Sequence, residues 1–584
     1  MKSIIVIMTL AACILVVGHE GSGKDMKDMK GKDVAGVPGL SHLEIFRRSA
    51  GDQSGDIFLL TQRGNILVEE RNFIAEGFFP SHITTEDIKT GQRSTRVIPP
   101  HPITTHGYAW DYDLEIPLTF WEPTPKRLKR GTFKDLAIQQ DIAPTLARIL
   151  NIAPPAKSAG RVLGEALGKN EGVAAVPPPK AIVIFVQDQV GLGYLKAHGD
   201  RAPFIAKLMK QGANFSHASV SHVDVETSVG HAAIATGAFP PQNGISANYQ
   251  FQTGSWAMVP AFTLPQANGK YQEGWAGAFL APNLSDTLLK TTRGNSKVLS
   301  LAMAARASIA MGGHGALMKG VGQPYVIWAE ERGPDSGRYM TDSEVYTAPQ
   351  AVAKHQLHTY MEKFLAEHNG NWLDHKLTDP QGKPNYDVVK GTPIMPAYES
   401  AILLDAIAEL QIGKDDATDL VWVNMKATDY CGHMFGYESD ECGDVLGATD
   451  GAIERIVNAL QEATGGDLLT VFTADHGCAP LPELSGGLRL SRQDLLKGIN
   501  KEFDRKDNNI DVAQSATSSQ LYINRKELEF NGHTLKEVAT YLRNLEVPMT
   551  APGNMLADEW KKKSGGAGKK FFFDVVERDS LRQK

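Results

Sequence analysis

The chain has 584 residues and a formal net charge of −7, with 42% hydrophobic and 22% charged residues, a composition that excludes a disordered chain and a protein with many membrane spans. Its length allows about four domains of roughly 150 residues, or one large α/β unit with insertions. The acidic balance predicts no nucleic-acid-binding surface, and four cysteines are too few for a disulfide scaffold or a cysteine-rich zinc module.

Residues 1–18 have the pattern of an export signal. A positive charge precedes an apolar run over 4–17, and Gly18 offers a small residue for cleavage. The run is shorter than the about 20 residues of a membrane-spanning helix, although an uncleaved anchor is an alternative. Lipidation at Cys13 is another alternative, because the residues before it are similar to a bacterial lipoprotein box. We expect an exported protein, periplasmic or secreted, with a flexible segment over 19–40 and a membrane tether, if any, through the N-terminus alone.

The stretch 54–150 has an α/β pattern of its own. Two strands and one helix are expected, at 56–61, 117–121 and 145–150. Asp141 is the expected N-cap of that helix, with a proline in its first turn. The proline-rich stretch 168–180 then predicts an extended linker.

Beyond residue 180 strands alternate with helices. Three continuous apolar runs predict strands buried on both faces, at 181–186, 420–425 and 468–473. Two intervening helices each place four apolar residues on one face: Phe204, Ile205, Leu208 and Met209, and Ile453, Ile456, Val457 and Leu460. This alternation predicts an α/β fold with a mainly parallel central sheet and helices on both faces. Functional residues in such sheets gather just past the carboxyl ends of the strands.

Four groups of polar residues lie at such positions. They are Asp188, Thr227 with Ser228 and His231, Asp429 with His433, and Asp475 with His476. Carboxylates and imidazoles at one sheet edge supply the oxygen and nitrogen ligands of zinc and similar ions. A hydroxyl at a helix N-terminus can meet a phosphate, because free N–H groups and the helix dipole favour an anion. Each group alone is more often a cap or a polar loop, but the four together predict a metal site.

The order and spacing of these groups over most of 180–480 resemble the alkaline phosphatase superfamily, in its threonine-nucleophile branch of secreted phosphatases and type I phosphodiesterase/nucleotide pyrophosphatases. The matching stretches are 186–189, 226–248, 428–433 and 473–477. The resemblance implies Thr227 as the nucleophile, with Ser228 as the alternative. It also implies two divalent metal ions, expected to be Zn²⁺. Their ligands would be Thr227, Asp188, Asp475 and His476 for the first, and Asp429, His433 and one further histidine for the second.

That further histidine is missing from its place downstream of His476. The one histidine there, His533, lies at the predicted start of an exposed helix, where a capping or surface role is expected. A Thr-His-Gly segment at His106 lies instead near the N-terminus. In the family's order, three more matching blocks surround it, at 54–58, 141–150 and 160–163.

These displaced blocks suggest a circular permutation. Residues 41–167 would be the family's C-terminal part, 168–180 would join the old termini, and 181–584 would be the main part of the domain. New chain ends at exposed sites are tolerated when the old termini lie close together. The alternative is a separate N-terminal domain with chance similarity.

The resemblance also has implications for whether the substrate is a phosphate monoester or a diester. Asn248 matches the family asparagine that contacts phosphate, and Arg306 falls where the monoesterases carry a Lys-x-Arg pair, although the lysine position is Ala304 here. A surface helix charge is the alternative for Arg306. The main hypothesis is an exported, metal-dependent phosphomonoesterase that acts through a phosphothreonine on a small-molecule phosphate ester. Two alternatives are a phosphodiesterase or nucleotide pyrophosphatase, and an inactive binding module on the same fold.

The cysteines add little to this chemistry. Cys431 and Cys478 are interpreted as small packed residues rather than zinc ligands, although both lie close to the proposed ligands in the sequence. Cys442 could pair with either after export.

Overall fold

The computed structural model describes residues 35–68, 82–86, 93–97, 104–168, 176–252, 257–265, 271–330, 337–378, 389–505, 508–547 and 569–582. They belong to one unit, Ala35–Lys584. The predicted signal with Cys13, most of the expected flexible segment and the middle of the predicted linker lie outside the described residues. No helix of the described ranges is both long and apolar enough to cross a membrane.

A nine-stranded sheet runs through the middle of the unit. In spatial order its strands are β20 (Tyr339–Met340), β19 (Tyr325–Ala329), β18 (Val298–Ala302), β23 (Asp419–Asn424), β11 (Ala181–Val186), β24 (Leu468–Thr473), β8 (Leu118–Trp121), β12 (Ala213–Phe215) and β9 (Gly131–Phe133). The five strands from β19 to β24 are parallel. All residues of β11, β23 and β24 are buried, which explains their continuous apolar sequences. The three strands predicted from these runs are confirmed and lie side by side.

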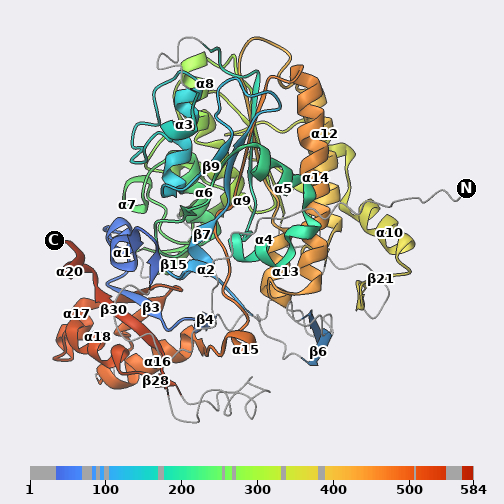
Figure 1. Ribbon diagram of the computed structural model, residues 1–584. Helices are drawn as coiled ribbons and strands as arrows, with labels where there is room; N and C mark the ends of the chain where they lie inside the picture. The colour runs from blue at the N-terminus through green and yellow to red at the C-terminus, as the bar shows by residue number, and fades with distance from the viewer. Residues whose placement is uncertain are drawn as a thin grey trace, which may run out of the picture. The chain divides into compact units, whose positions relative to one another are not determined.

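Helices cover both faces of this sheet (Figure 1). One group packs around the longest helix: α4 (Leu192–His198), α5 (Pro203–Gln211), α12 (Ile394–Glu409), α13 (Ala427–Phe435) and α14 (Asp440–Thr464). The other group comprises α3 (Ile142–Ile149), α6 (Thr227–Thr236), α7 (Pro240–Asn243), α8 (Leu284–Thr292) and α9 (Ala305–Gly312). The four apolar residues predicted to share a face of α14 are all buried. The predicted fold class, a mainly parallel sheet between helices, is confirmed.

The stretch that precedes residue 168 completes this sheet. β8 pairs antiparallel with β24, so that Phe120 lies opposite Val471. β12 pairs with β8 on its other side, and β9 pairs with β12. A strand from the N-terminal part of the chain is therefore an interior strand of the main sheet.

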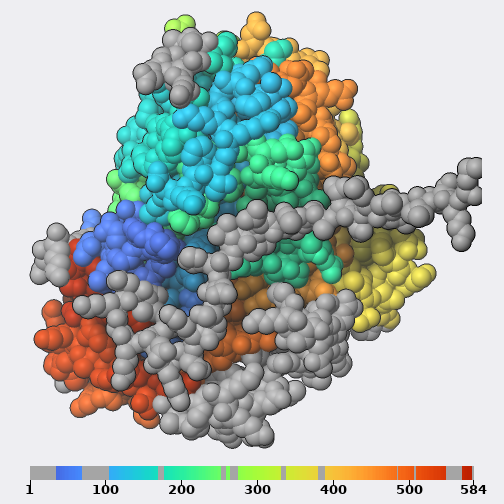
Figure 2. Space-filling model, viewed as in Figure 1, coloured from blue at the N-terminus to red at the C-terminus, as the bar shows by residue number. Residues whose placement is uncertain are grey.

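A second, four-stranded sheet joins the two ends of the chain. Its order is β26 (Ala513–Ala516), β27 (Gln520–Ile523), β3 (Ile57–Thr61) and β30 (Phe572–Glu577). Helices α16 (Arg492–Phe503), α17 (Arg525–Phe530) and α18 (Leu535–Arg543) contribute apolar residues to the separate core of this sheet. Helix α1 (His42–Ser49) contacts α20 (Arg578–Arg582), and His42 Nε2 lies 3.0 Å from Asp574 Oδ2. The blue and red surfaces adjoin accordingly in Figure 2.

Shorter elements fill the remaining connections. Two-stranded pairs are β1 (Gly36–Val37) with β2 (Leu40–Ser41), β5 (His82–Glu86) with β6 (Arg93–Val97), β14 (Tyr249–Gln252) with β15 (Ala257–Pro260), β16 (Thr263–Pro265) with β17 (Tyr271–Glu273), β21 (Asn371–Trp372) with β22 (His375–Lys376), β25 (Arg489–Ser491) with β4 (Ile66–Val68), and β28 (Glu546–Val547) with β29 (Lys569–Lys570). A three-stranded sheet has the order β10 (Ala137–Ile138), β13 (Ala218–Ser219) and β7 (Glu115–Ile116). The remaining α-helices are α2 (Asp111–Leu114), α10 (Leu357–Glu367) and α15 (Pro482–Ser485).

The structure can be compared with the predictions for two helix starts and for the cysteines. Asp141 lies at the N-cap position of α3, but its carboxylate accepts N–H groups of Ile138 and Arg161 instead of one from the helix. His533 lies beside the start of α18, where Thr534 and Glu537 form the cap, as expected of a surface position. The three described cysteines, Cys431, Cys442 and Cys478, are buried and free.

Candidate functional site

The carboxyl ends of three neighbouring strands bring the predicted residues together. Val186, the last residue of β11, pairs with Thr473, the last residue of β24. Asp188 and Asp475 therefore each follow at the same distance beyond their strand, and His476 comes next. The start of α13, which carries Asp429 and His433, follows β23 on the other side of β11. This is the sheet edge at which ligands bind in parallel α/β folds.

One group of possible metal ligands consists of Asp188, Asp475 and His476. Each offers one ligand atom, and these atoms all lie within 4.8 Å of one another. His476 Nε2 lies 3.3 Å from Asp475 Oδ2 and 3.7 Å from Asp188 Oδ1. All three side chains are fully buried. Two carboxylates and an imidazole at this spacing match the donor set of a zinc ion.

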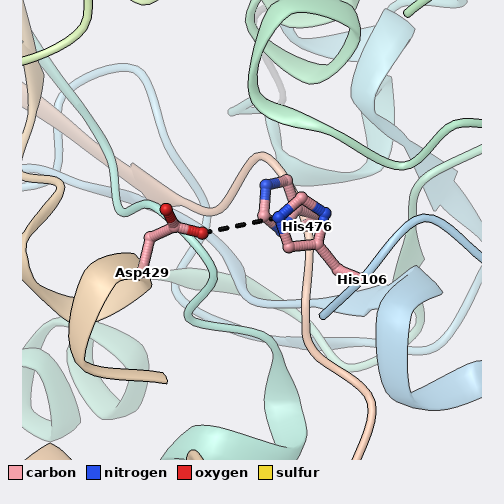
Figure 3. A group of neighbouring side chains, drawn as sticks. All are labelled: His106, Asp429 and His476. Atoms are coloured by element: carbon pink, nitrogen blue, oxygen red, sulfur yellow. Dashed lines mark ion pairs between the residues drawn. The ribbon is translucent and has the colours of Figure 1, made fainter. Parts of the chain in front are cut away.

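A second group adjoins the first around Asp429. His106 Nε2 and His433 Nε2 lie 3.5 Å and 3.3 Å from the same oxygen, Asp429 Oδ1. The ring of His106 stacks on that of His476 at 3.7 Å between centroids, so His476 takes part in both groups. Figure 3 shows His106 and His476 overlapping, with Asp429 opposite them on its helix. The structure thus brings His106, 323 positions before Asp429 in the chain, to the second group.

The orientation of the three histidines is fixed by the backbone. In each ring Nδ1 lies within 3.0 Å of a carbonyl oxygen: that of Val225 for His106, Thr104 for His433 and Gly477 for His476. An Nδ1–H that donates to a carbonyl leaves Nε2 with its lone pair, which is the tautomer that a metal ligand needs. All three Nε2 atoms are also those nearest the carboxylates.

Two buried atoms of the first group have no hydrogen-bond donor or acceptor among the described residues. They are Asp475 Oδ2 and His476 Nε2. Buried polar atoms are nearly always paired, so such an exception indicates a site for an ion or a water molecule. A divalent cation beside both atoms would satisfy them, so the residues present fit a metal ion.

One carboxylate, that of Asp113, fixes the backbone of the loop that carries His106. Asp113 Oδ2 accepts the backbone N–H groups of Gly107 and Tyr108 at 3.0 and 2.7 Å. Gly107 has φ +121°, and a Cβ there would approach Ser518 Oγ to 2.5 Å. The glycine of the Thr-His-Gly segment is therefore required by both backbone conformation and space.

The proposed nucleophile, Thr227, is the first residue of α6. This buried helix approaches the metal-ligand loop closely, since a Cβ on Gly230 would lie 2.6 Å from the carbonyl oxygen of Asp475. Asn248 Oδ1 accepts the N–H of Ser228 at 2.9 Å, and the N–H of Asn248 donates to Glu226 Oε2 at 2.7 Å. Asn248 is thus hydrogen-bonded to the start of α6. The resemblance implies that this asparagine contacts phosphate.

Lys426 is a site residue that the sequence did not reveal. It precedes α13, is 2% exposed, and its Nζ donates to Thr227 Oγ1 at 3.0 Å. The same Nζ lies 3.1 Å from Asp188 Oδ1 and 2.7 Å from Asp429 Oδ2. The ammonium group therefore joins the proposed nucleophile to one carboxylate of each metal-ligand group. A lysine before Thr428 in the sequence looks like an ordinary surface charge, and only the packing of α6 against the strand ends makes it central.

The electrostatics of the site follow from burial and from these contacts. Burial raises the pKa of Asp475 well above its ordinary value, and the nearby charge of Asp188 adds to the effect. Burial also opposes ionisation of Asp429, but the charges of Lys426 and His433 outweigh it and hold the pKa of Asp429 well below its ordinary value. Burial opposes protonation of Lys426, whereas Asp188 and Asp429 outweigh it and raise the pKa of this lysine.

Arg306 lies on α9, which packs against α6. Its positive charge acts on both His231 and Lys426 across the site. Arg306 is half-buried, and its contact with phosphate stays a prediction. Ala304, at the start of the same helix, is fully buried and supplies no charge.

Comparison with known proteins places this geometry in context. The model of the family described as type I phosphodiesterase / nucleotide pyrophosphatase matches residues 182–569. Among curated relatives, alkaline phosphatase PafA of Elizabethkingia meningoseptica is 25% identical over 408 residues, which cover 63% of this chain and 73% of that protein. A calcium-transporting ATPase of Myroides odoratus is 25% identical over 394 residues, 60% of this chain and 70% of that protein.

The fold is also similar to a solved structure. The crystal structure of wild-type alkaline phosphatase PafA superimposes with a TM-score of 0.52 at 21% identity, over 69% of this chain and 85% of that one. This likeness agrees with the large central sheet flanked by helices.

Proposed function

The chain belongs to the type I phosphodiesterase / nucleotide pyrophosphatase family and is a phosphoric ester hydrolase; we propose that it is an exported, metal-dependent phosphomonoesterase that acts through a phosphothreonine on Thr227. The observation that carries this proposal is the place of the Thr227 hydroxyl. It lies at the N-terminus of a buried helix, in contact with Lys426, whose ammonium also reaches one carboxylate of each metal-ligand group. The helix end favours an anion and the carboxylates favour cations, so a phosphate ester and its metal ions suit the same place.

Two divalent cations are proposed, and zinc suits the carboxylate and imidazole donors best. Asp188, Asp475, His476 and Thr227 would hold the first, and Asp429, His433 and His106 the second. When bound, such ions supply Lewis acidity toward the nucleophile and the phosphate oxygens. Asp475 Oδ2 and His476 Nε2, which have no hydrogen bond within the described residues, support this assignment.

The reaction has two displacement steps. In the first, Oγ of Thr227 attacks phosphorus in line, the bond from phosphorus to the ester oxygen breaks, and the alcohol leaves with the proton that the Thr227 hydroxyl gives up. In the second, water attacks phosphothreonine, which releases inorganic phosphate and restores the Thr227 hydroxyl. Asn248 fixes the first turn of α6 through Ser228, so the nucleophile is held in place before substrate arrives. The side-chain NH₂ of Asn248 is the group proposed to meet a phosphate oxygen.

Preference for a monoester rests on positive charge near Thr227. A monoester dianion is best matched by cationic donors, and Arg306 supplies one on the helix that packs against α6. The second candidate function is a phosphodiesterase or nucleotide pyrophosphatase. It is favoured by Ala304, because the resemblance places a lysine of the monoesterases at that position.

The two candidates are separated by measuring kcat/KM of the zinc-loaded protein for p-nitrophenyl phosphate and for bis-p-nitrophenyl phosphate. We expect the monoester to be preferred by about 100-fold, the effect of one well-placed donor in a buried site. Chelation should abolish both activities. Preference for the diester would establish the second candidate, and a metal-loaded protein that cleaves neither ester would be a binding module on the same fold.

Export is supported by the signal pattern of residues 1–18 alone. The mass of the protein recovered from periplasm or culture medium should correspond to a chain that begins at His19. A lipid on Cys13 would indicate an anchored protein, and an intact N-terminus in the cytosol would contradict export.

A further inference from the structure

The buried ammonium of Lys426 lies where the proposed reaction takes place. Within hydrogen-bond distance it has the hydroxyl oxygen of Thr227, at 3.0 Å, and carboxylate oxygens of Asp188 and Asp429, at 3.1 and 2.7 Å. Burial of a lysine is costly unless its charge is paired, and this one is paired by two groups. A bridge between two carboxylates would explain the ion pairs, but it does not require contact with the threonine.

The position of Lys426 in the sheet is related to that of the missing lysine. In the parallel pair of β18 and β23, Ala302 lies opposite Asn424. Ala304 and Lys426 each lie two residues beyond this pair. The two positions are thus equivalent points at the ends of neighbouring strands, and both follow their strand into a helix, α9 and α13. Ala304 has no charged side chain, whereas Lys426 carries a positive charge at the equivalent point.

The same edge also holds Arg306, two residues beyond Ala304. Its positive charge acts on Lys426 and on His231 of α6, so both cations belong to the electrostatic surroundings of Thr227. The chain thus has two cations in these surroundings: Lys426, which contacts Thr227, and Arg306, on the helix α9 that packs against α6.

We propose that Lys426 is a catalytic residue whose ammonium donates to a non-bridging oxygen of the phosphoryl group during its transfer to Thr227. This proposal rests on the proposed phosphomonoesterase function. Because phosphorus bonds directly to Oγ of Thr227, its remaining oxygens come within reach of a donor that already contacts Oγ. A cation there interacts more strongly with a monoester dianion than with a diester, which carries one negative charge fewer. Lys426 would thus act on ester preference as well as on rate.

The first test compares Lys426→Met with the wild-type enzyme after metal analysis of both. We expect kcat/KM for p-nitrophenyl phosphate to fall about 100-fold and that for the bis-ester to fall less than about tenfold. The affinity for inorganic phosphate should weaken by at least about tenfold at unchanged metal content, and Lys426→Arg should keep most of the monoester preference. Equal losses on both esters, or unchanged phosphate affinity, would leave only the ion-pair role and overturn the proposal.

Lys390→Met is the matched control. The Nζ of Lys390 lies over the ring of Tyr430 on α13, the helix that follows Lys426, and this variant removes a nearby positive charge while Lys426 keeps its contact with Thr227. Both esters should then react within about twofold of wild type.

A second test needs no variant and so remains decisive if Lys426→Met fails to fold. In a crystal structure of the wild-type, metal-loaded enzyme with inorganic phosphate, Lys426 Nζ should lie within hydrogen-bond distance of a phosphate oxygen. An ammonium that stays on the carboxylates and does not reach the phosphate would overturn the proposal. Failure of the proposed function itself would appear separately, as a wild-type enzyme that does not hydrolyse p-nitrophenyl phosphate.

Discussion

Three buried carboxylates of this protein lie in the site, where the charge of one buried lysine acts on each of them. Asp188 and Asp429 contact Lys426 at 3.1 and 2.7 Å, and the charge of the same lysine acts on Asp475. Bound cations would favour the ionised form of all three carboxylates. Glu399, on α12, is buried without any ion pair in the described ranges, and its pKa is governed mainly by burial.

Replacement of Glu399 by glutamine should flatten the dependence of stability on pH. Glu399 Oε1 accepts the hydroxyl hydrogen of Tyr339 at 2.6 Å, and burial raises the pKa of Glu399 to about 8. The folded state therefore keeps a proton that the unfolded chain releases near its ordinary pKa of about 4.5. The wild-type free energy of unfolding should fall, by roughly 2–4 kcal/mol, as pH rises from that value to about 8.

The check is denaturant unfolding of wild type and Glu399→Gln between pH 5 and pH 9, roughly the window of this titration. A glutamine matches the protonated carboxyl in shape and in hydrogen bonding, so the two proteins should have similar stability at the acidic end. The variant should become the more stable one as pH rises. Parallel curves would show that Glu399 is ionised in the folded state throughout.

At the level of single residues, the sequence was informative where several possible metal ligands follow predicted buried strands. Histidines and aspartates after buried apolar runs could be recognised as possible ligands, and the structure groups His106, Asp188, Asp429, Asp475 and His476. Lys426 could not be recognised, since its role depends on the register of β18 against β23 and on its contact with Thr227 at the start of α6. The contact between Asn248 and Ser228 also depends on a turn that the sequence does not specify.

Among the elements, strand prediction succeeded where strands are buried on both faces. β11 and β24 have the predicted bounds, and β23 begins and ends one residue early, because each is a continuous apolar run in a parallel sheet. The short strands β9 and β12 have no such run, and they exist because they extend the sheet beyond β8. The four-stranded sheet could not be predicted for another reason: β3 and β30 come from opposite ends of the chain, and local sequence carries no signal for such pairing.

At the scale of the whole molecule, we propose that the chain is a circular permutant of its family, with residues 41–167 in place of the family's C-terminal part. Three observations support this order. His106 lies beside Asp429, β8 lies between β24 and β12, and β3 lies between β27 and β30. The family model leaves the same stretch outside its match, since it begins at residue 182.

The permutation predicts that the chain can be reordered but not shortened. A chain with residues 176–582 first, a short Gly-Ser linker, and residues 35–175 last should fold with a melting temperature within about 5 °C of wild type and keep its ester preference. Residues 181–584 alone should fail to fold, because two sheets lose an interior strand. Thermal unfolding and hydrolysis assays check both. A stable, active protein made of 181–584 alone would indicate a separate N-terminal domain instead.

The proposed catalysis depends above all on Oγ of Thr227 as the atom that receives the phosphoryl group. The direct measurement is peptide mass spectrometry of metal-loaded enzyme quenched in acid during turnover of p-nitrophenyl phosphate. We predict phosphate on Thr227 in the wild type and in Ser228→Ala, and none, with metal content unchanged and turnover abolished, in Thr227→Ala. Phosphate on Ser228, or rapid turnover by Thr227→Ala, would contradict the account.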